Sequence, residues 1–327
     1  MRLLVSGTAY HVAFPASVGR RTLRARPVEV ASRYHPGNRQ GANFLISIIL
    51  PAKNEAAALA ELLPHLRALQ PEAEIIVVND GSTDDTEALC ERHGVQCVSS
   101  PYSMGNGAAI KRGARAASGD ILVFMDADGQ HDPNDIPRLL GKLDEGYDMA
   151  VGARDWDGQA GVGRGLANGF YNWLASRITG HRVEDLTSGF RAVRADKFRQ
   201  FLYLLPNGFS YPTTSTMAFF RSAYGVVYVP IKVAQRDGTT SHIKPLRDGL
   251  RFLLIIFKIA TLYSPLKLFV PASAVFFALG CLNYARTFLD YGRLTNMSTL
   301  LWSAAVIVFL IGLVSEQITA LTYRRED

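Results

Sequence analysis

Short apolar runs alternate with stretches of helical spacing through the first half of the chain. Residues 45–50 (LISIIL) are apolar, rich in isoleucine and end at Pro51, which is typical of a strand buried on both faces. Leucines then recur at helical spacing across residues 55–69. We expect further strands at residues 74–79, 95–99, 120–125 and 148–152, and a helix at residues 106–117. This alternation predicts a doubly wound, mostly parallel α/β sheet.

Less regular elements are expected around this alternation. Ser82 or Thr83 is the expected cap of the helix after the second strand, because acidic residues occupy its first turn. Further along, the pattern predicts a helix over residues 164–179, a turn leading into a strand over 185–194, and a strand over 226–231.

Polar clusters follow three of the predicted strands directly. They are residues 51–55 (PAKNE), 80–85 (DGSTDD) and 126–131 (DADGQH). In doubly wound sheets, ligands bind at the carboxyl ends of the strands. We therefore expect the three clusters to meet in one binding site.

The last quarter of the chain has a different pattern. Residues 244–262 mix basic with large apolar residues, which predicts an amphipathic helix on a membrane surface. Residues 268–284 and 300–323 are apolar and approach the roughly 20 residues that cross a bilayer. Two buried helices of a soluble domain are the alternative. Glu316 lies inside the second stretch, about 12 Å from the charged end of that stretch by helix rise. Its side chain would face the other helix, a partner or the membrane interface.

These patterns divide the chain into five parts. We expect a basic extension at 1–43, an α/β domain at 44–240, an amphipathic helix at 241–263, a two-helix transmembrane hairpin at 264–323 and a tail at 324–327. Basic residues flank the hairpin at both of its ends, so the positive-inside rule predicts a cytoplasmic α/β domain. The hairpin also offers a surface for homo-oligomers.

Positive charge is concentrated in the first 43 residues. They hold seven arginines and one acidic residue, an excess equal to the net charge of +6 of the whole chain. Such a tail could touch anionic lipid or nucleic acid, or it could be a solvated arm or sequence translated from a misplaced start codon. The remainder is neutral and has no nucleic-acid motif, so we expect no nucleic-acid partner. Three cysteines without CxxC spacing predict neither a disulfide framework nor a zinc site.

Asp126 and Asp128 stand two residues apart after a predicted strand. Two carboxylates on a turn suit a hard divalent cation such as Mg²⁺ or Mn²⁺, which would neutralise a diphosphate leaving group. A turn with capping aspartates is the alternative. Asp80 could accept hydrogen bonds from a base or a ribose, or belong to a capping turn. The chain has no GxxxxGK[ST], and its glycine cluster at residues 161–165 fails the dinucleotide-binding pattern.

Six short motifs occur in the order found in one enzyme family. They are IILPAKNE (48–55), VVNDGSTD (77–84), GNGAAIKRG (105–113), FMDADGQH (124–131), GAR (152–154) and DLTSGFR (185–191). Together they resemble inverting glycosyltransferase family 2, and more narrowly its dolichyl-phosphate mannose synthase and undecaprenyl-phosphate glycosyltransferase branch. The resemblance covers about residues 46–262, and the two apolar stretches match the anchor of this branch.

The resemblance implies a GT-A fold and inverting transfer of a hexose. The donor would be a nucleotide sugar of the GDP-mannose or UDP-glucose type, the acceptor a polyprenyl phosphate in the lipid bilayer, and the cofactor Mg²⁺ or Mn²⁺. The residues implied at the nucleotide sugar are Pro51, Asn54, Glu55, Asp80, Lys111, Asp126 and Arg191. Those implied at the metal and diphosphate are Asp126, Asp128 and Gln130.

Four residues are implied to act in catalysis: Asp128, Arg154, Arg164 and Arg236. Arg154 and Arg164 would grip the lipid phosphate, while Arg191 and Arg236 would hold the diphosphate or close a loop over it. Arginine suits these roles because it can bind phosphate through two parallel hydrogen bonds. A surface ion pair is the alternative for each arginine.

The sequence departs from the family pattern in two places. Residues 235–242 read QRDGTTSH, with Thr239 where the family often has glycine and His242 where it often has lysine. The predicted helix at 211–220 also lacks an acidic residue often found there. Both departures concern the acceptor side of the expected site.

The expected mechanism is a single in-line displacement at the anomeric carbon. A phosphate monoester with a second pKa of about 6 is already an anion at neutral pH, so it needs no general base. The first alternative is a family 2 transferase that acts on a glycan or lipid hydroxyl, with Glu184 or Asp185 as base, although the QxxRW segment of processive members is absent. The second alternative is a non-catalytic membrane scaffold.

Overall fold

The computed structural model describes residues 44–154, 162–208, 210–233, 257, 261 and 263–322 of the chain. Several predictions concern residues outside these ranges: the basic extension, Arg236 and the departures at Thr239 and His242, most of the amphipathic segment and the C-terminal tail. The side chain of Arg164 also lies outside the described part.

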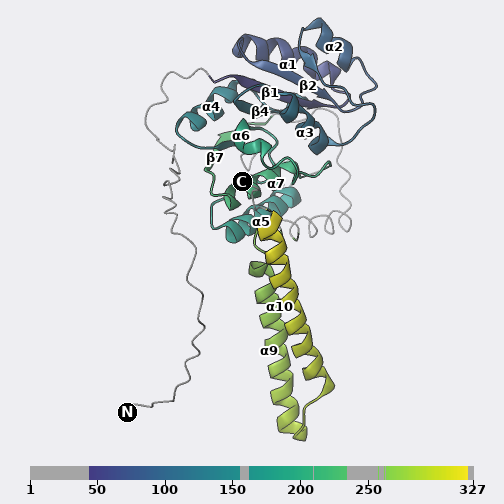
Figure 1. Cartoon of the computed structure of the whole chain (residues 1–327), viewed down its shortest axis with the longest axis vertical. Coiled ribbons are helices and arrows are strands. Elements are labelled where there is room, and N and C mark those ends of the chain that lie inside the picture. Colours follow the sequence, from purple (N-terminus) through teal and green to yellow (C-terminus); the bar gives the residue numbers. More distant parts are fainter. Residues whose placement is uncertain are drawn as a thin grey trace, which may run out of the picture. The chain divides into compact units, whose positions relative to one another are not determined.

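The described part of the chain before the two long helices is built on a seven-stranded sheet with the order β3-β2-β1-β4-β6-β5-β7 (Figure 1). The strands are β1 (Ile46–Ala52), β2 (Glu74–Asn79), β3 (Gln96–Cys97), β4 (Ile121–Phe124), β5 (Met149–Arg154), β6 (Arg191–Arg194) and β7 (Val226–Ile231). β1 pairs in parallel with both β2 and β4, as predicted, and its Ile48 lies opposite Ile75 and Val123. β6 is antiparallel to its neighbours β4 and β5, so the sheet is mixed.

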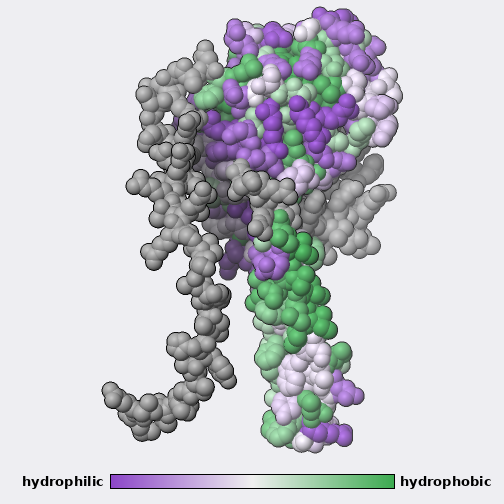
Figure 2. All heavy atoms as spheres, viewed as in Figure 1, coloured by the Kyte–Doolittle hydropathy of each residue, from purple (hydrophilic) through white to green (hydrophobic). Residues whose placement is uncertain are grey.

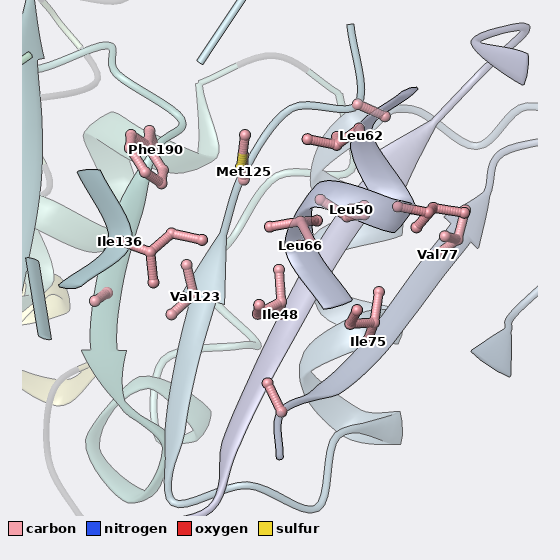
Figure 3. Packing of buried hydrophobic residues seen from close by; sticks show 14 of the residues in the cluster. Ile48, Leu50, Leu62, Leu66, Ile75, Val77, Val123, Met125, Ile136 and Phe190 are labelled. Carbon is pink, nitrogen blue, oxygen red and sulfur yellow. The ribbon is translucent and has the colours of Figure 1, made fainter. Parts of the chain in front are cut away.

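Helices cover both faces of this sheet. Their bounds are α1 (Ala56–Leu69), α2 (Thr86–Arg92), α3 (Asn106–Ala116), α4 (Ile136–Asp144), α5 (Val162–Thr179), α6 (Ala195–Arg199) and α7 (Tyr211–Arg221), with a short 3₁₀ turn at Pro133–Asp135. Because side chains alternate along a strand, Ile48 and Leu50 belong to the core that includes α1 and α4, whereas Ile49 belongs to the core on the other face, which includes α3 and α7. Figure 3 shows the first of these two cores, where Leu62 and Leu66 of α1 lie over β1 and β2.

Two long helices form an apolar hairpin after the sheet domain: α9 (Leu266–Tyr291) and α10 (Asn296–Thr322). Each is long and apolar enough to cross a membrane, and Figure 2 shows the hydrophobic surface along them. They pack through small residues, with Gly280 against Trp302 and Gly312 against Phe269. α9 extends beyond the apolar stretch predicted at residues 268–284, so its last turns include Arg286 and Asp290, which form an ion pair.

The buried position of Leu66 gives a test of this core. Leu66→Ala should lower the free energy of unfolding by about 2–5 kcal/mol, because the lost atoms leave a cavity between α1 and the sheet. Leu45→Ala is the matched control; Leu45 is 42% exposed, so the change should stay within about 0.5 kcal/mol. Unfolding of the detergent-solubilised protein, followed by circular dichroism, measures both. Equal stability of the two variants would contradict this packing.

Candidate functional site

A cavity of about 450 Å³ opens where β1, β2 and β4 end. Pro51 and Glu55 line it from the end of β1, Asp80 from the end of β2, and Asp126 and Asp128 from the loop after β4. Ser103, Gly105 and Asn106 close another side. The structure therefore brings the three predicted polar clusters together, because parallel strands end at the same edge of a sheet.

Asp80 organises the loop that forms one wall of this cavity. Its carboxylate accepts hydrogen bonds from the Ser103 hydroxyl at 2.7 Å and from the backbone N–H groups of Met104 at 2.7 Å and Gly105 at 2.9 Å. Burial by itself would raise the pKa of Asp80, but these hydrogen bonds and the charge of Lys53 hold it below its ordinary value. Asp80 is thus an ionised wall residue that positions the neighbouring loop.

Asn54 joins the loop after β1 to the loop after β2. Its backbone N–H donates to the Ser82 hydroxyl at 2.9 Å, and its side-chain oxygen accepts from the Thr83 N–H at 2.7 Å. The prediction that Ser82 or Thr83 caps α2 is therefore wrong. The helix begins later, at Thr86, and the Asp84 carboxylate accepts from the N–H of that residue. Asn54 does not line the cavity, so the structure gives it a role in shaping the site.

The loop after β4 presents two carboxylates to the cavity. Asp126 is about one-third exposed, and its Oδ2 lies 3.6 Å from His131 Nε2. Asp128 Oδ1 accepts from the backbone N–H of Gln130 at 3.2 Å, and Gly129 between them has a φ of +72°, which favours glycine. Within the described residues, no group of three His, Cys, Asp or Glu side chains is placed to hold a metal by itself. A cation held by Asp126 and Asp128 would need further oxygen ligands from a bound molecule, as Mg²⁺ commonly does with substrate phosphates.

A smaller cavity of about 150 Å³ shares Asn106 and Asp126 with the first one. β6 runs antiparallel to β4, and Arg191 at its start lies opposite Phe124 at the end of β4. The residues before β6 are therefore carried to the same edge of the sheet, where Thr187 and Gly189 line the small cavity together with the first turn of α7. A Cβ atom at Gly189 would lie 2.9 Å from Asp126 Oδ2, so only glycine leaves the carboxylate in place.

Arg154 at the end of β5 forms a two-point ion pair with Asp185. Its Nε and Nη2 atoms donate to the two carboxylate oxygens at 2.7 and 3.0 Å, and Nη2 also donates to the Thr187 hydroxyl at 2.6 Å. Burial opposes the charge of both groups, yet their mutual attraction raises the pKa of Arg154 and lowers that of Asp185. Arg154 is 28% exposed and has both an internal partner and an open side.

Neither Arg191 nor Lys111, which the resemblance places at the nucleotide sugar, is among the residues that line the two cavities. Arg191 is fully buried, and its guanidinium donates to the Ser188 and Pro212 carbonyls and to the hydroxyls of Ser215 and Thr216. It therefore clamps the first turn of α7. Lys111 donates to the Leu205 carbonyl at 3.2 Å and to the side chain of Asn207, so it fixes the loop beside α3.

Sequence reasoning missed several residues that line the cavities, namely Ser103, Asn106, Thr187, Gly189, Ser210 and Thr213. Thr187 and Gly189 stand inside the motif DLTSGFR, and Asn106 stands inside the motif GNGAAIKRG, so these three positions were a usable signal. Ser103 lies in a loop, and Ser210 and Thr213 lie at the start of α7. Only tertiary packing brings these segments to the cavities.

Family models match both parts of the chain. Residues 47–202 match the model of glycosyl transferase family 2, and residues 264–321 match that of the GtrB C-terminal hairpin. The chain carries a glycosyltransferase family 2 domain. The order of the motifs, the cavity at the edge of the sheet and the anchor-like hairpin all agree with these two matches.

Relatives are found among named transferases. Glycosyltransferase AglJ of Haloferax volcanii is 28% identical over 229 residues, which are 68% of this chain and 75% of AglJ. Undecaprenyl-phosphate 4-deoxy-4-formamido-L-arabinose transferase of Klebsiella pneumoniae is 36% identical over 159 residues, 46% of this chain and 48% of that protein. The chain thus spans about half the length of this second relative.

Solved structures share the fold of the sheet domain. Glucosyl-3-phosphoglycerate synthase from Mycobacterium tuberculosis, in complex with Mn²⁺, uridine diphosphate and glucosyl-3-phosphoglycerate, superposes with a TM-score of 0.52 at 25% identity. The superposition covers 66% of this chain and 78% of that one. The expected GT-A architecture is therefore confirmed for this glycosyltransferase.

The hydrogen bonds to Asp80 predict a pH-dependent stability. A carboxyl whose pKa is lower in the folded than in the unfolded protein stabilises the fold above the unfolded pKa, and this contribution is lost as the pH falls through the folded pKa. The Tm difference between wild type and Asp80→Asn should therefore be largest at neutral pH and shrink below about pH 4. The exposed Glu61→Gln is the charge-matched control. A Tm difference that is constant or grows on acidification would contradict this role of Asp80.

Proposed function

We propose that this glycosyltransferase moves a hexose from a nucleoside-diphosphate sugar onto a polyprenyl phosphate at a membrane surface. The observation that carries the proposal is the presence, in one chain, of a carboxylate-lined cavity at the carboxyl edge of a GT-A sheet and an apolar hairpin of the GtrB type. Relatives named for undecaprenyl-phosphate sugar transfer support the lipid phosphate as acceptor. The donor is of the GDP-mannose or UDP-glucose type.

The donor diphosphate would lie against Asp126 and Asp128. A shared Mg²⁺ or Mn²⁺ would supply charge neutralisation of the departing nucleoside diphosphate. The Mn²⁺ and uridine diphosphate bound by glucosyl-3-phosphoglycerate synthase support this assignment, since that protein shares the fold. The exposed Asp126 oxygens and the Asp128 carboxylate fit a cation that completes its shell with diphosphate oxygens. Asp80 keeps the wall loop in place, while Pro51 and Glu55 border the nucleotide.

The acceptor phosphate would be held by arginine. Arg154 keeps a fixed geometry through Asp185 and Thr187, and a bound phosphate would compete for or share its open edge. Arg164, in the first turn of α5, and Arg236 complete the proposed set of arginines. The phosphate oxygen attacks the anomeric carbon from the face opposite the diphosphate, which inverts the configuration.

A hydroxyl acceptor would need a general base, and Asp185 is the candidate that the sequence offers. Its carboxylate is buried, both oxygens bind Arg154, and the pKa of Asp185 lies below its ordinary value. Those features make it a weak base, because a general base works best with a pKa near the operating pH. This observation favours the phosphate acceptor over the hydroxyl alternative.

The hairpin would anchor the enzyme in the bilayer with the catalytic domain on the cytoplasmic side. Lys267 stands at the start of α9, and Arg324 and Arg325 follow the end of α10. Both membrane-proximal ends that adjoin the catalytic domain are thus basic, and the positive-inside rule supports this orientation.

The direct experiment is a transfer assay with the full chain. Labelled nucleotide sugars are offered singly, with short-chain polyprenyl phosphate and Mg²⁺, Mn²⁺ or EDTA. We expect a lipid-linked product from one donor, formed with metal and lost with EDTA. Donor hydrolysis or transfer to a glycan, with no lipid product, would contradict the proposal.

Two aspartates of the same loop provide a matched pair of variants. Asp128→Asn should reduce the transfer rate by about 100-fold or more, because stabilisation of the leaving diphosphate is lost. Asp132→Asn changes the charge equally, but Asp132 is exposed and caps the short turn at Pro133–Asp135, so its rate should stay within about threefold of wild type. Initial rates at saturating donor measure both. Comparable rates for the two variants would rule out a donor role for Asp128.

A further inference from the structure

One carboxylate in the apolar hairpin contacts both the hairpin and the catalytic domain. Glu316 of α10 lies with its Oε2 atom 3.3 Å from the backbone N–H of Leu266 and 3.4 Å from the Ser264 hydroxyl, at the start of α9. Its Oε1 atom lies 3.9 Å from Nη2 of Arg221, the last residue of α7. A single side chain thus joins α10, α9 and α7.

An acidic residue in an apolar helix of this length is costly unless it is paired. Glu316 is 23% exposed and Arg221 is 19% exposed, so the pair is largely shielded from water. The N-terminal end of α9 adds a favourable helix dipole and an otherwise unbonded N–H. Glu316 therefore lies among groups that complement its negative charge. These groups come from both the hairpin and the catalytic domain, which meet at this junction.

Helix α7 connects this junction to the active-site edge. Its first turn lines the small cavity beside Asp126, and its last residue is Arg221. Every residue from Tyr211 to Phe220 is buried, and the Arg191 guanidinium clamps the first turn. A short, fully packed helix of this kind is rigid, so a contact that fixes Arg221 also fixes the active-site edge relative to the hairpin.

Two further contacts hold the start of the hairpin against α5. The Lys267 ammonium donates to the Ile178 carbonyl at 2.7 Å, and the Tyr263 hydroxyl donates to the Thr179 carbonyl at 3.0 Å. Both acceptors are carbonyls of the last turn of α5, where intrahelical partners are lacking. Tyr263 and Leu268 also pack against the apolar cluster that contains Phe220. The hairpin is therefore docked on two helices of the catalytic domain.

We propose that Glu316 is a positioning residue for the reaction with the membrane-bound acceptor. Through Arg221 and the start of α9 it fixes the catalytic domain on the hairpin, so that the site meets the phosphate of a lipid whose chain lies in the bilayer. This inference rests on the proposed lipid-phosphate acceptor. It adds that the ion pair between Glu316 and Arg221 sets the position of the catalytic domain relative to the bilayer.

The test compares Glu316→Gln with Asp290→Asn in the full chain reconstituted in vesicles. Asp290 belongs to an ion pair with Arg286 that has the same 3.9 Å separation but lies within α9, and it is the matched control. Glu316→Gln should raise the KM for long-chain polyprenyl phosphate in vesicles by about tenfold, with little change in the KM for the donor. Transfer to a short-chain, water-soluble prenyl phosphate in detergent should stay at the wild-type rate. The charge exchange Arg221→Glu with Glu316→Arg should recover part of the loss.

Amide hydrogen exchange across α7 is the second readout, and it needs no acceptor. We expect faster exchange at the end of α7 in Glu316→Gln than in wild type or Asp290→Asn. Unchanged exchange together with an unchanged acceptor KM would overturn the inference, and so would an equal loss of transfer to the soluble acceptor, which indicates a general loss of structure. If wild type forms no lipid-linked product, the proposed function fails, and the exchange data alone then decide whether Glu316 fixes α7.

Discussion

Parallel pairing of β1 with both β2 and β4 is the constraint on which the rest of the site depends. Because the three strands run in one direction, the loops that carry Glu55, Asp80 and Asp126 open at the same edge of the sheet. Strand β6 runs antiparallel to β4, so the residues that precede β6 reach the same edge. This places Gly189 against Asp126. The mixed sheet thus gathers acidic side chains that are spread along the chain from Glu55 to Asp128.

Internal partners divide these acidic residues into two groups. Asp80 is bound by the N–H groups of its neighbouring loop, and Asp185 is bound by Arg154. Both remain ionised, and their hydrogen bonds shape the walls of the site. Asp126 and Asp128 face the cavity itself, where a cation and diphosphate can share them. Geometry and charge therefore separate the carboxylates that shape the walls from those that face the cavity.

The sequence predicted the elements and the meeting of polar loops because strand periodicity and helix spacing are local signals. It was less informative where a side chain's direction depends on tertiary packing. Arg191 and Lys111 stand in family motifs, yet they bind the first turn of α7 and the loop beside α3 instead of facing the cavities. Ser82 and Thr83 were predicted to cap a helix, but both form hydrogen bonds with Asn54 from a distant loop instead. The contact between Glu316 and Arg221 joins residues almost 100 positions apart, so no local pattern could reveal it.

An ionised lipid phosphate needs no general base, and it is the acceptor that we propose for this enzyme. The most direct test offers two acceptors of equal chain length in identical vesicles, polyprenyl phosphate and polyprenol, with the donor and metal held constant. We expect transfer to the phosphate only, with inversion at the anomeric carbon detected by nuclear magnetic resonance of the product. Transfer to polyprenol at a comparable rate, or a product with retained configuration, would contradict this proposal.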